Sequence, residues 1–263
     1  MTEPQDRVSE LYNTIAEAYD SGYDVASHRR VYDQLAWEHV SSLQLPAGAT
    51  IVDVGCGTGR WIPRLLERGH YVIGIERASG MIDLLRARKL GPAFTLIESS
   101  MESARVPRAS ADLVLALGSV QYALDPAAMI RRFASWTRPG GAVCVYVDSL
   151  VSLVLELLRE GKQSEAMERL QTRRGKFRQG DKTAPLYLHD RRTLEAHFAA
   201  AGLVDVRCHG LAVSASALGR AGCGEAMAND ENSAMALERL LSADPAMADS
   251  GLHIMAIGHK PAR

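Results

Sequence analysis

Glycines cluster directly after a short β-branched segment in the first quarter of the chain. Residues 50–54 form this segment, and Gly55, Gly57 and Gly59 follow it at alternate positions. Glycines at the junction of a strand and a helix let the backbone turn tightly and approach a ligand where any Cβ would collide. Glu76 ends the next apolar segment, about 20 residues further on, which is the spacing of a carboxylate that binds ribose hydroxyls. The pattern predicts a site for a nucleotide-like ligand.

The position of the third glycine separates two kinds of nucleotide site. Dinucleotide-binding folds use G-x-G-x-x-G, in which the helix N-terminus holds a pyrophosphate. Counted from Gly55, the last of these positions is Arg60, and the glycine stands at 59 instead. This argues against a nicotinamide-dependent dehydrogenase. The D-x-G-x-G-x-G form that begins at Asp53 resembles the first motif of the class I S-adenosylmethionine-dependent methyltransferases, whose ligand carries no phosphate.

Further segments extend the resemblance over most of the chain. Residues 12–20 are similar to the family's N-terminal segment Y-D-x-x-A-x-x-Y-D, which covers the cofactor, with Asn13 in place of the acid. Residues 99–102 match the adenine-contacting segment, with Ser100 where an Asp is common, and a hydroxyl accepts more weakly than a carboxylate. The resemblance implies cofactor contacts from Tyr12, Tyr19, Asp53, Gly55, Cys56, Gly57, Gly59, Glu76, Arg77, Met81, Ser100, Met101, Leu117 and Gly118.

Some of these residues also have a purely structural interpretation. Asp53 could cap the glycine turn, because Asp favours such positions. Tyr12 and Tyr19 are seven positions apart and could form an apolar stripe on a helix. Met81 could belong to the core. These alternatives stay open from the sequence alone.

Catalysis needs a base only where the proton of the acceptor must leave before or during the transfer. We consider His189, Tyr122 and His28 for this role. His189 precedes Asp190, a favourable helix N-cap, so it could instead be an ordinary loop residue.

Apolar periodicity divides the chain into alternating strands and helices, and most strands are nearly continuous apolar runs. Such runs are typical of parallel strands buried on both faces. We predict an α/β fold with a Rossmann-like, doubly wound sheet, and the resemblance implies seven strands, mostly parallel, with one antiparallel strand near the C-terminus. The predicted strands are 50–54, 71–75, 94–97, 113–117, 142–147, 204–209 and 252–258. The predicted helices are 9–19, 27–42, 61–68, 81–88, 128–137, 152–159, 164–173 and 191–201, followed by a broken helical segment, 218–248.

We expect one domain over residues 1–263, with a helical cap (1–45), a cofactor-binding core (46–149), a helical insertion (150–185) and the rest of the sheet (186–263). The insertion leaves the carboxyl end of the fifth strand, where ligands of open α/β sheets bind, so we expect a lid over the acceptor. Its expected apolar face is Leu153, Val154, Leu157 and Leu158. The basic residues expected to meet a carboxylate or phosphate of the acceptor are Arg173, Arg174, Lys176 and Arg178.

The composition argues against nucleic acid, a membrane or a metal ion as a partner. Lys and Arg number 30 against 31 for Asp and Glu, so no bulk field attracts nucleic acid or a membrane. No apolar run approaches the 18 or so residues that span a bilayer, and we expect a cytoplasmic protein. The four cysteines form no C-x-x-C pair, which favours reduced structural thiols and no metal site.

The sequence thus predicts methyl transfer from S-adenosylmethionine to a small molecule. The resemblance is strongest to the quinone and natural-product methyltransferases, which implies a role in secondary or quinone-type metabolism. A non-catalytic S-adenosylmethionine sensor or partner subunit is the alternative. The identity of the acceptor, the attacked atom (O, N or C) and the oligomeric state are left open.

Overall fold

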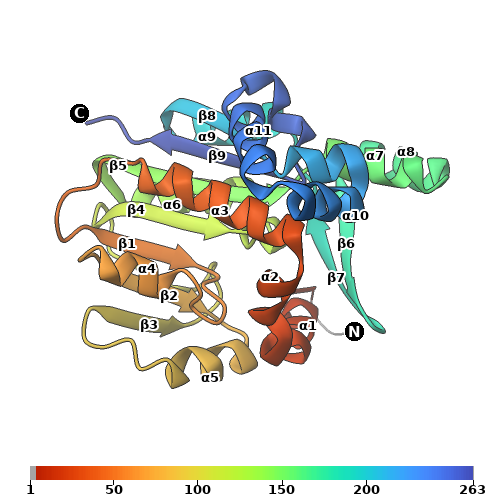
Figure 1. Ribbon diagram of the computed structural model, residues 1–263. Helices are drawn as coiled ribbons and strands as arrows, with labels where there is room; N and C mark the ends of the chain where they lie inside the picture. Colours follow the sequence, from red (N-terminus) through yellow and green to blue (C-terminus); the bar gives the residue numbers. More distant parts are fainter. Residues whose placement is uncertain (1–3, 263) are drawn as a thin grey trace.

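A seven-stranded sheet of order β3-β2-β1-β4-β5-β9-β8 forms the centre of the computed structural model, which describes residues 4–262 (Figure 1). Only β9 runs against its neighbours β5 and β8, and the other adjacent strands pair in parallel. This confirms the predicted fold class. The strands are β1 (Thr50–Val54), β2 (Tyr71–Glu76), β3 (Phe94–Glu98), β4 (Ala111–Leu117), β5 (Thr137–Asp148), β8 (Val204–Leu211) and β9 (His253–His259).

Both faces of the sheet are covered by helices, which is why its strands are apolar throughout. In β4, Leu113 and Leu115 pack into the core on one face, whereas Val114 and Ala116 pack into the core on the other. The helices on the first face are α3 (Ser27–Ser41), α4 (Ile62–Glu67), α10 (Val213–Asn229) and α11 (Glu231–Ala243), and those on the second are α6 (Pro126–Trp136) and α9 (Arg191–Ala200).

Two further groups of helices gather at the carboxyl ends of the parallel strands. Helix α1 (Pro4–Tyr19) packs against α5 (Ser79–Ala87) there, and α2 (Ser21–Val25) connects α1 to α3 (Figure 1). Helices α7 (Leu150–Arg159) and α8 (Gln163–Thr172) follow β5 and project from the same end. The ends of the strands are therefore partly enclosed.

The insertion is not wholly helical, which corrects the prediction for residues 150–185. The basic stretch forms an antiparallel hairpin, β6 (Arg174–Gln179) and β7 (Lys182–Tyr187), around a two-residue turn at Gly180 and Asp181. On its inner face Gly175 and Ala184 are fully buried or nearly so. This period of two and the Gly-Asp turn are both hairpin signals that the helical interpretation overlooked.

Other differences concern the ends of elements. β5 begins at Thr137, five residues before the predicted strand, and α10 begins at Val213, five residues before the predicted helical segment. That segment is divided into α10, α11 and the 3-10 helix η2 (Pro245–Ser250), and a second 3-10 helix, η1 (Val120–Tyr122), follows β4.

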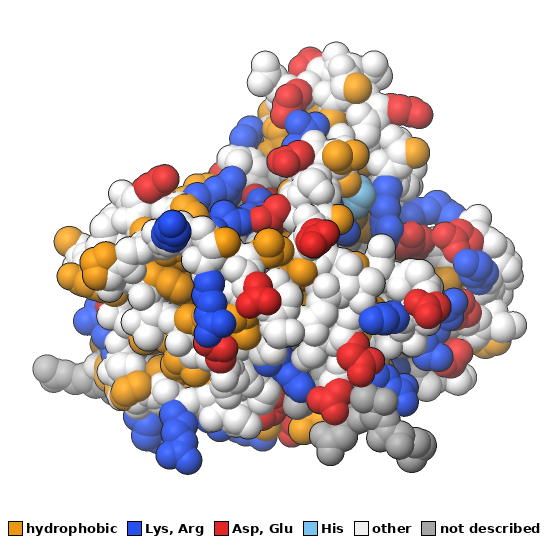
Figure 2. All heavy atoms as spheres, turned by 90° about the horizontal axis from the view of Figure 1, so that it is seen from below, with side chains coloured by type: hydrophobic (Ala, Val, Ile, Leu, Met, Phe, Trp, Pro, Cys, Tyr) orange, Lys and Arg blue, Asp and Glu red, His pale blue; other side chains and the backbone are white. Residues whose placement is uncertain are grey.

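Charged side chains of both signs lie on the surface, and the cysteines are unpaired. Figure 2 shows acidic and basic side chains interspersed over the face seen from below. In the part of the chain that the structure describes, no helix is long and apolar enough to cross a membrane, and no group of His, Cys, Asp and Glu could hold a metal ion. All four cysteines are free, as predicted.

Candidate functional site

The glycine turn is attached to the end of β2. The N–H groups of Gly55 and Cys56 both donate to the carbonyl of Ile75, at 2.7 and 3.1 Å. All three glycines have positive φ, and they differ in what surrounds them. A Cβ added to Gly59 would lie 2.3 Å from Leu85 of α5, whereas one added to Gly57 would meet only a Met81 sulfur at 4.0 Å. Gly59 thus lets the helix pack closely, and Gly57 faces open space.

Glu76 lies at the carboxyl end of β2 and is held by the backbone. Its Oε2 accepts the N–H of Gly57 at 2.9 Å, and its Oε1 accepts the N–H groups of Arg77 and Ala78, both at 2.8 Å. Hydrogen bonds to a charged group are among the stronger ones in proteins. The carboxylate is therefore fixed beside the glycine turn, where the predicted ribose contact requires it.

These residues line the first of two adjoining cavities, which is open to solvent on one side. Most of the predicted cofactor residues are brought together here. The residues from that prediction are Tyr12, Tyr19, Gly55, Gly57, Glu76, Arg77, Met81, Ser100, Met101, Leu117 and Gly118. The remaining lining residues are Val8, Ile75, Ser99, Glu102, Ser119 and Tyr122.

Three predicted cofactor residues lie behind the wall of this cavity. Asp53 is 4% exposed, and burial, followed by the nearby charge of Glu76, raises its pKa to about 7. Burial also raises the pKa of the Cys56 thiol. Gly59 packs against α5 as described. Asp53 thus lies beneath the turn, whereas Cys56 and Gly59 belong to the turn but do not line the cavity.

The N-terminal segment is bonded to the glycine turn and to α5. Asn13, which replaces the acid of the family pattern, accepts the N–H of Gly80 at 2.8 Å near the start of α5. Asp20 accepts the Thr58 hydroxyl at 2.6 Å and forms an ion pair with Arg88. Helix α1 is therefore held over the first cavity by polar contacts as well as by packing.

Arg60, at the position where a dinucleotide site needs glycine, has a structural partner. It forms an ion pair with Asp33 of α3, which is 6% exposed. Asp33 also accepts the indole N–H of Trp61 at 2.8 Å and lies 3.3 Å from a guanidinium nitrogen of Arg64. The residue after the turn thus attaches α3 to the turn, and Arg64 attaches α3 to α4.

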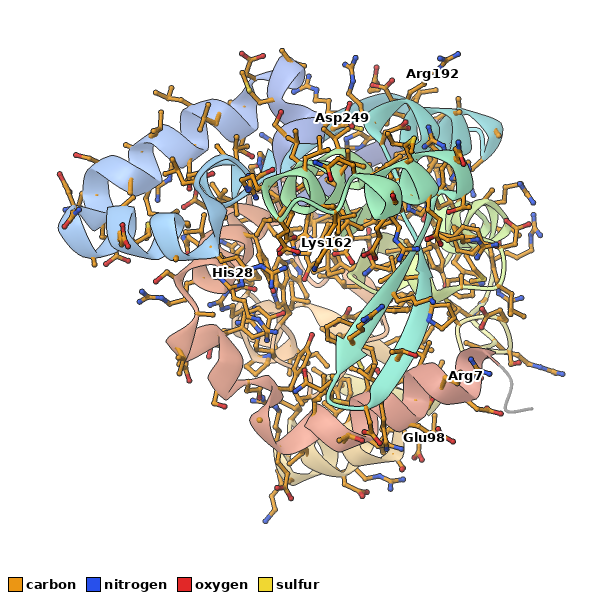
Figure 3. All side chains as sticks on the ribbon, turned by 90° about the vertical axis from the view of Figure 1, so that its right-hand side faces the viewer. Arg7, His28, Glu98, Lys162, Arg192 and Asp249 are labelled. Atoms are coloured by element: carbon orange, nitrogen blue, oxygen red, sulfur yellow. The ribbon has the colours of Figure 1, made fainter. Side chains whose placement is uncertain are left out.

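A second cavity, of about 1200 Å³, opens beside the first. The two share five lining residues, and where they meet the hydroxyl of Tyr12 donates to that of Tyr122 at 3.3 Å. Figure 3 shows the β6–β7 hairpin crossing this end of the molecule towards α1. There Lys182 of the hairpin donates to the Thr14 hydroxyl at 2.8 Å. The shared lining residues are Tyr12, Tyr19, Leu117, Gly118 and Tyr122.

The three predicted base candidates have different surroundings. Tyr122 lines both cavities, and burial raises its pKa, so the phenol stays protonated and can donate. His28 lines the second cavity, where burial, with Arg220 and Arg29, lowers its pKa to about 4. His189 is 2% exposed and lines neither cavity; its ring packs against Tyr187 and His197.

The second cavity also contains a His–Asp pair that no sequence motif indicates. Asp148 ends β5 and His253 begins β9, and the two are direct cross-strand partners. His253 Nδ1 lies 2.9 Å from Asp148 Oδ1, while Gln121 donates to Asp148 Oδ2 at 3.2 Å and accepts the Asp148 N–H at 3.1 Å. No short-range motif joins residues so far apart in the chain, since only the register of the last strand brings them together.

Three of the four basic residues expected to meet an anionic acceptor, Arg173, Arg174 and Arg178, line neither cavity. Arg173 forms an ion pair with Asp190 at 2.6 Å, and the Arg174 guanidinium lies 3.4 Å from the ring centroid of Tyr187. Of the four basic residues, Lys176 alone lines the second cavity. Lys176 is also exposed to solvent. Arg173 and Arg174 thus have partners within the chain, and Lys176 is the member of this set that lies at the cavity.

Comparison with known proteins agrees with this geometry. Residues 51–141 match the family described as "Methyltransferase domain". A malonyl-[acyl-carrier protein] O-methyltransferase of Yersinia pestis is 30% identical over 139 residues, which cover 52% of this chain and 48% of the relative. A ubiquinone biosynthesis O-methyltransferase of Xanthomonas axonopodis is 32% identical over 107 residues, 40% of this chain and 45% of the relative. The chain thus spans about half the length of the curated relatives that it matches.

Solved structures extend the likeness to nearly the whole chain at the level of fold. An S-adenosylmethionine-dependent methyltransferase from Mesorhizobium loti has a TM-score of 0.58 at 15% identity, covering 91% of this chain and all of the other. The matched core, residues 51–141, contains the glycine turn and Glu76. Residues 51–141 thus match a methyltransferase domain, and the chain shares its fold with an S-adenosylmethionine-dependent methyltransferase of known structure.

Proposed function

We propose that the chain transfers a methyl group from S-adenosylmethionine to a small molecule bound in the second cavity. The observation that carries the proposal is the joining of the two cavities at Tyr12 and Tyr122. The first cavity has the glycine turn and the fixed carboxylate for a nucleoside, and the second, which is the larger of the two, opens beside it for an acceptor. When bound, S-adenosylmethionine supplies a methyl group activated by a sulfonium.

The residues of the first cavity fit that cofactor. Gly57 leaves space that a side chain would fill, and Glu76 has a carboxylate fixed for the ribose. Ser100 and Met101 line the part of the wall next to Glu76 and Arg77, where we place the adenine. Tyr12 and Tyr19 lie towards the second cavity, where we place the methionine end.

The protein's own contribution is to hold and enclose the reactants. Fixing two reactants in a reactive orientation can lower a barrier by about 7 to 11 kcal/mol in favourable cases. Helix α1 covers the first cavity, and the hairpin bonded to it through Lys182 borders the second. We propose that these segments exclude water, with residues 150–187 acting as the lid. Leu153 of α7 lines the cavity, whereas Leu158 is 47% exposed and does not belong to that wall.

The names of the relatives support a small or carrier-bound acceptor. The two matched proteins are named for a malonyl-[acyl-carrier protein] and for ubiquinone biosynthesis. Their matches cover half of each relative, so the acceptor of this chain stays a proposal. We place it in secondary or quinone-type metabolism, in the cytoplasm, with no nucleic acid or membrane as partner.

The test uses trideuteromethyl-labelled S-adenosylmethionine. The purified protein is incubated with this cofactor and fractionated small-molecule extract, and mass spectrometry detects any compound that gains a trideuteromethyl group. We expect at least one labelled product, which disappears with Gly57→Val. Binding of S-adenosylhomocysteine without any labelled product would favour the alternative, a non-catalytic sensor or partner subunit. Binding of NADH in place of S-adenosylhomocysteine would favour a dehydrogenase.

A further inference from the structure

The second cavity contains a histidine that can take up a proton. We propose that the molecule that receives the methyl group is a phenol, that His253 removes the proton of its hydroxyl group, and that Asp148 positions His253. This rests on the proposed function and adds to it the class of acceptor and the atom methylated.

The pair places a histidine within ion-pair distance of a carboxylate. His253 Nδ1 is buried 2.9 Å from Asp148 Oδ1, without hydrogen-bond alignment, so Nε2 is the ring nitrogen left for a substrate. Within residues 4–262, no hydrogen bond to Nε2 is present, and the His253 side chain is 18% exposed. Gln121, itself 4% exposed, fixes Asp148 with two hydrogen bonds. The imidazole therefore lies beside a supported carboxylate and lines the cavity.

The walls around this pair favour a flat ring. The ring centroid of His253 lies 4.5 Å from that of Tyr32 and 5.2 Å from that of Tyr146. Tyr12 and Phe177 stack at 6.2 Å on the hairpin side of the cavity. Aromatic rings bind other rings by stacked or edge-to-face contacts. A hydroxylated aromatic ring combines this shape with a proton that must leave for its oxygen to become a good nucleophile.

Other ionisable groups of the cavity are poorly suited to accept that proton. Burial raises the pKa of Tyr12 and of Tyr146, so both phenols stay protonated. The low pKa of His28 makes it a weak base. Glu156 lies 3.6 Å from a guanidinium nitrogen of Arg220. The charged and titratable groups that line the cavity with His253 are Tyr12, Tyr19, Tyr23, His28, Arg29, Tyr32, Tyr122, Tyr146, Asp148, Glu156, Lys176 and Arg220.

The chemistry balances without any further reagent. The O–H bond of the phenol breaks and its proton passes to Nε2 of His253. The oxygen forms a bond to the methyl carbon as the carbon–sulfur bond breaks, and that electron pair stays on sulfur. The products are an aryl methyl ether, S-adenosylhomocysteine and an imidazolium that returns its proton to water.

The first test needs no methyl transfer. The probe is 4-nitrophenol, whose acidity is close to that of imidazole and which turns yellow on ionisation. It is added to the protein saturated with S-adenosylhomocysteine, in a buffer acidic enough to keep the free probe colourless. We expect bound probe to show the phenolate absorption with the wild type and not with His253→Gln. Binding in the protonated form to both proteins, or no binding to the wild type, would overturn the proposal.

The second test measures methylation of 4-nitrophenol and 4-nitrocatechol. General bases contribute about 100- to 10,000-fold to rates, so His253→Gln should lower kcat by that factor and remove the acidic limb of the pH profile of kcat/KM. Asp148→Asn should shift that limb while leaving part of the rate. The control is His259→Gln, at the other end of β9, which should change neither.

Binding of S-adenosylhomocysteine tests the proposed function separately from the phenol assignment. All variants should bind it within about threefold of the wild type. A wild type that does not bind it would refute the proposed function itself. Normal binding with an unchanged rate and pH profile in His253→Gln, or methylation confined to carboxylates or amines, would refute the phenol assignment alone.

Discussion

Replacing Glu76 by Ala tests the proposed contact between its carboxylate and the ribose of the cofactor. The substitution removes the carboxylate that three backbone N–H groups hold beside the cavity. If the same carboxylate binds the ribose hydroxyls, one charge-assisted contact is lost, worth about 1.5 to 3 kcal/mol. The dissociation constant of S-adenosylhomocysteine should rise roughly 10- to 150-fold. Isothermal titration at fixed pH and salt measures it.

A matched control lies on the neighbouring strand. Glu98 ends β3 in register with Glu76, and its ion pair with Arg86 lies outside the first cavity. Glu98→Ala removes a carboxylate of the same strand position and should leave binding unchanged, and both variants should melt cooperatively. An unchanged dissociation constant in a folded Glu76→Ala protein, or an equal loss in both variants, would refute the assignment of Glu76 to the ribose.

Three further outcomes are expected. Gly57→Val should abolish binding of S-adenosylhomocysteine because the valine side chain enters open space that the ligand needs, whereas Gly59→Val should mainly lower the melting temperature, since its Cβ would collide with α5. Titration measures the binding and calorimetry measures the melting. Normal binding by Gly57→Val would show that the ligand does not lie at this turn. Burial, then the charge of His197, lowers the pKa of His189 from 6.5 to about 4, so the folded protein binds this proton less readily than the unfolded chain. The contribution of His189 to the free energy of unfolding is fully present above pH 6.5 and falls by up to about 3 kcal/mol as the pH drops towards 4. In urea unfolding, the free energy of unfolding should depend less on pH in His189→Gln than in the wild type. An equal pH dependence in both proteins would contradict this prediction. Trypsin should cleave the hairpin more slowly when S-adenosylhomocysteine and 4-nitrophenol are bound. Lys182→Ala, which removes the contact with α1, should weaken that protection. Cleavage at equal rates with and without the ligands would show that the hairpin does not act as a lid.

The cofactor side of the site was predictable because its signals are local. The glycine turn, Glu76 and the helix after the turn follow one another within a single β-α-β unit, so sequence spacing translates directly into position. What the sequence left open was which of the glycine-turn residues face the ligand. Asp53 and Gly59 lie beneath the surface, where burial and helix packing determine their roles.

The acceptor side depends on contacts between distant segments. Asp148 and His253 meet only through the register of an antiparallel strand pair, and that register is not encoded in a short motif. The hairpin could have been predicted from local signals. Its alternation of inward- and outward-facing residues and its Gly-Asp turn are present in the sequence, but the expectation of a helical insertion outweighed them. His189 illustrates the reverse case, a histidine beside an N-cap that proves to be buried away from both cavities.

The most direct test of the account is a crystal structure of the protein with S-adenosylhomocysteine. We predict density for one molecule in the first cavity, with its ribose hydroxyls on Glu76, its adenine beside Met101 and its sulfur towards the contact between Tyr12 and Tyr122. Density for the ligand elsewhere, or with its sulfur turned away from the second cavity, would contradict the proposal that methyl transfer takes place where the two cavities meet.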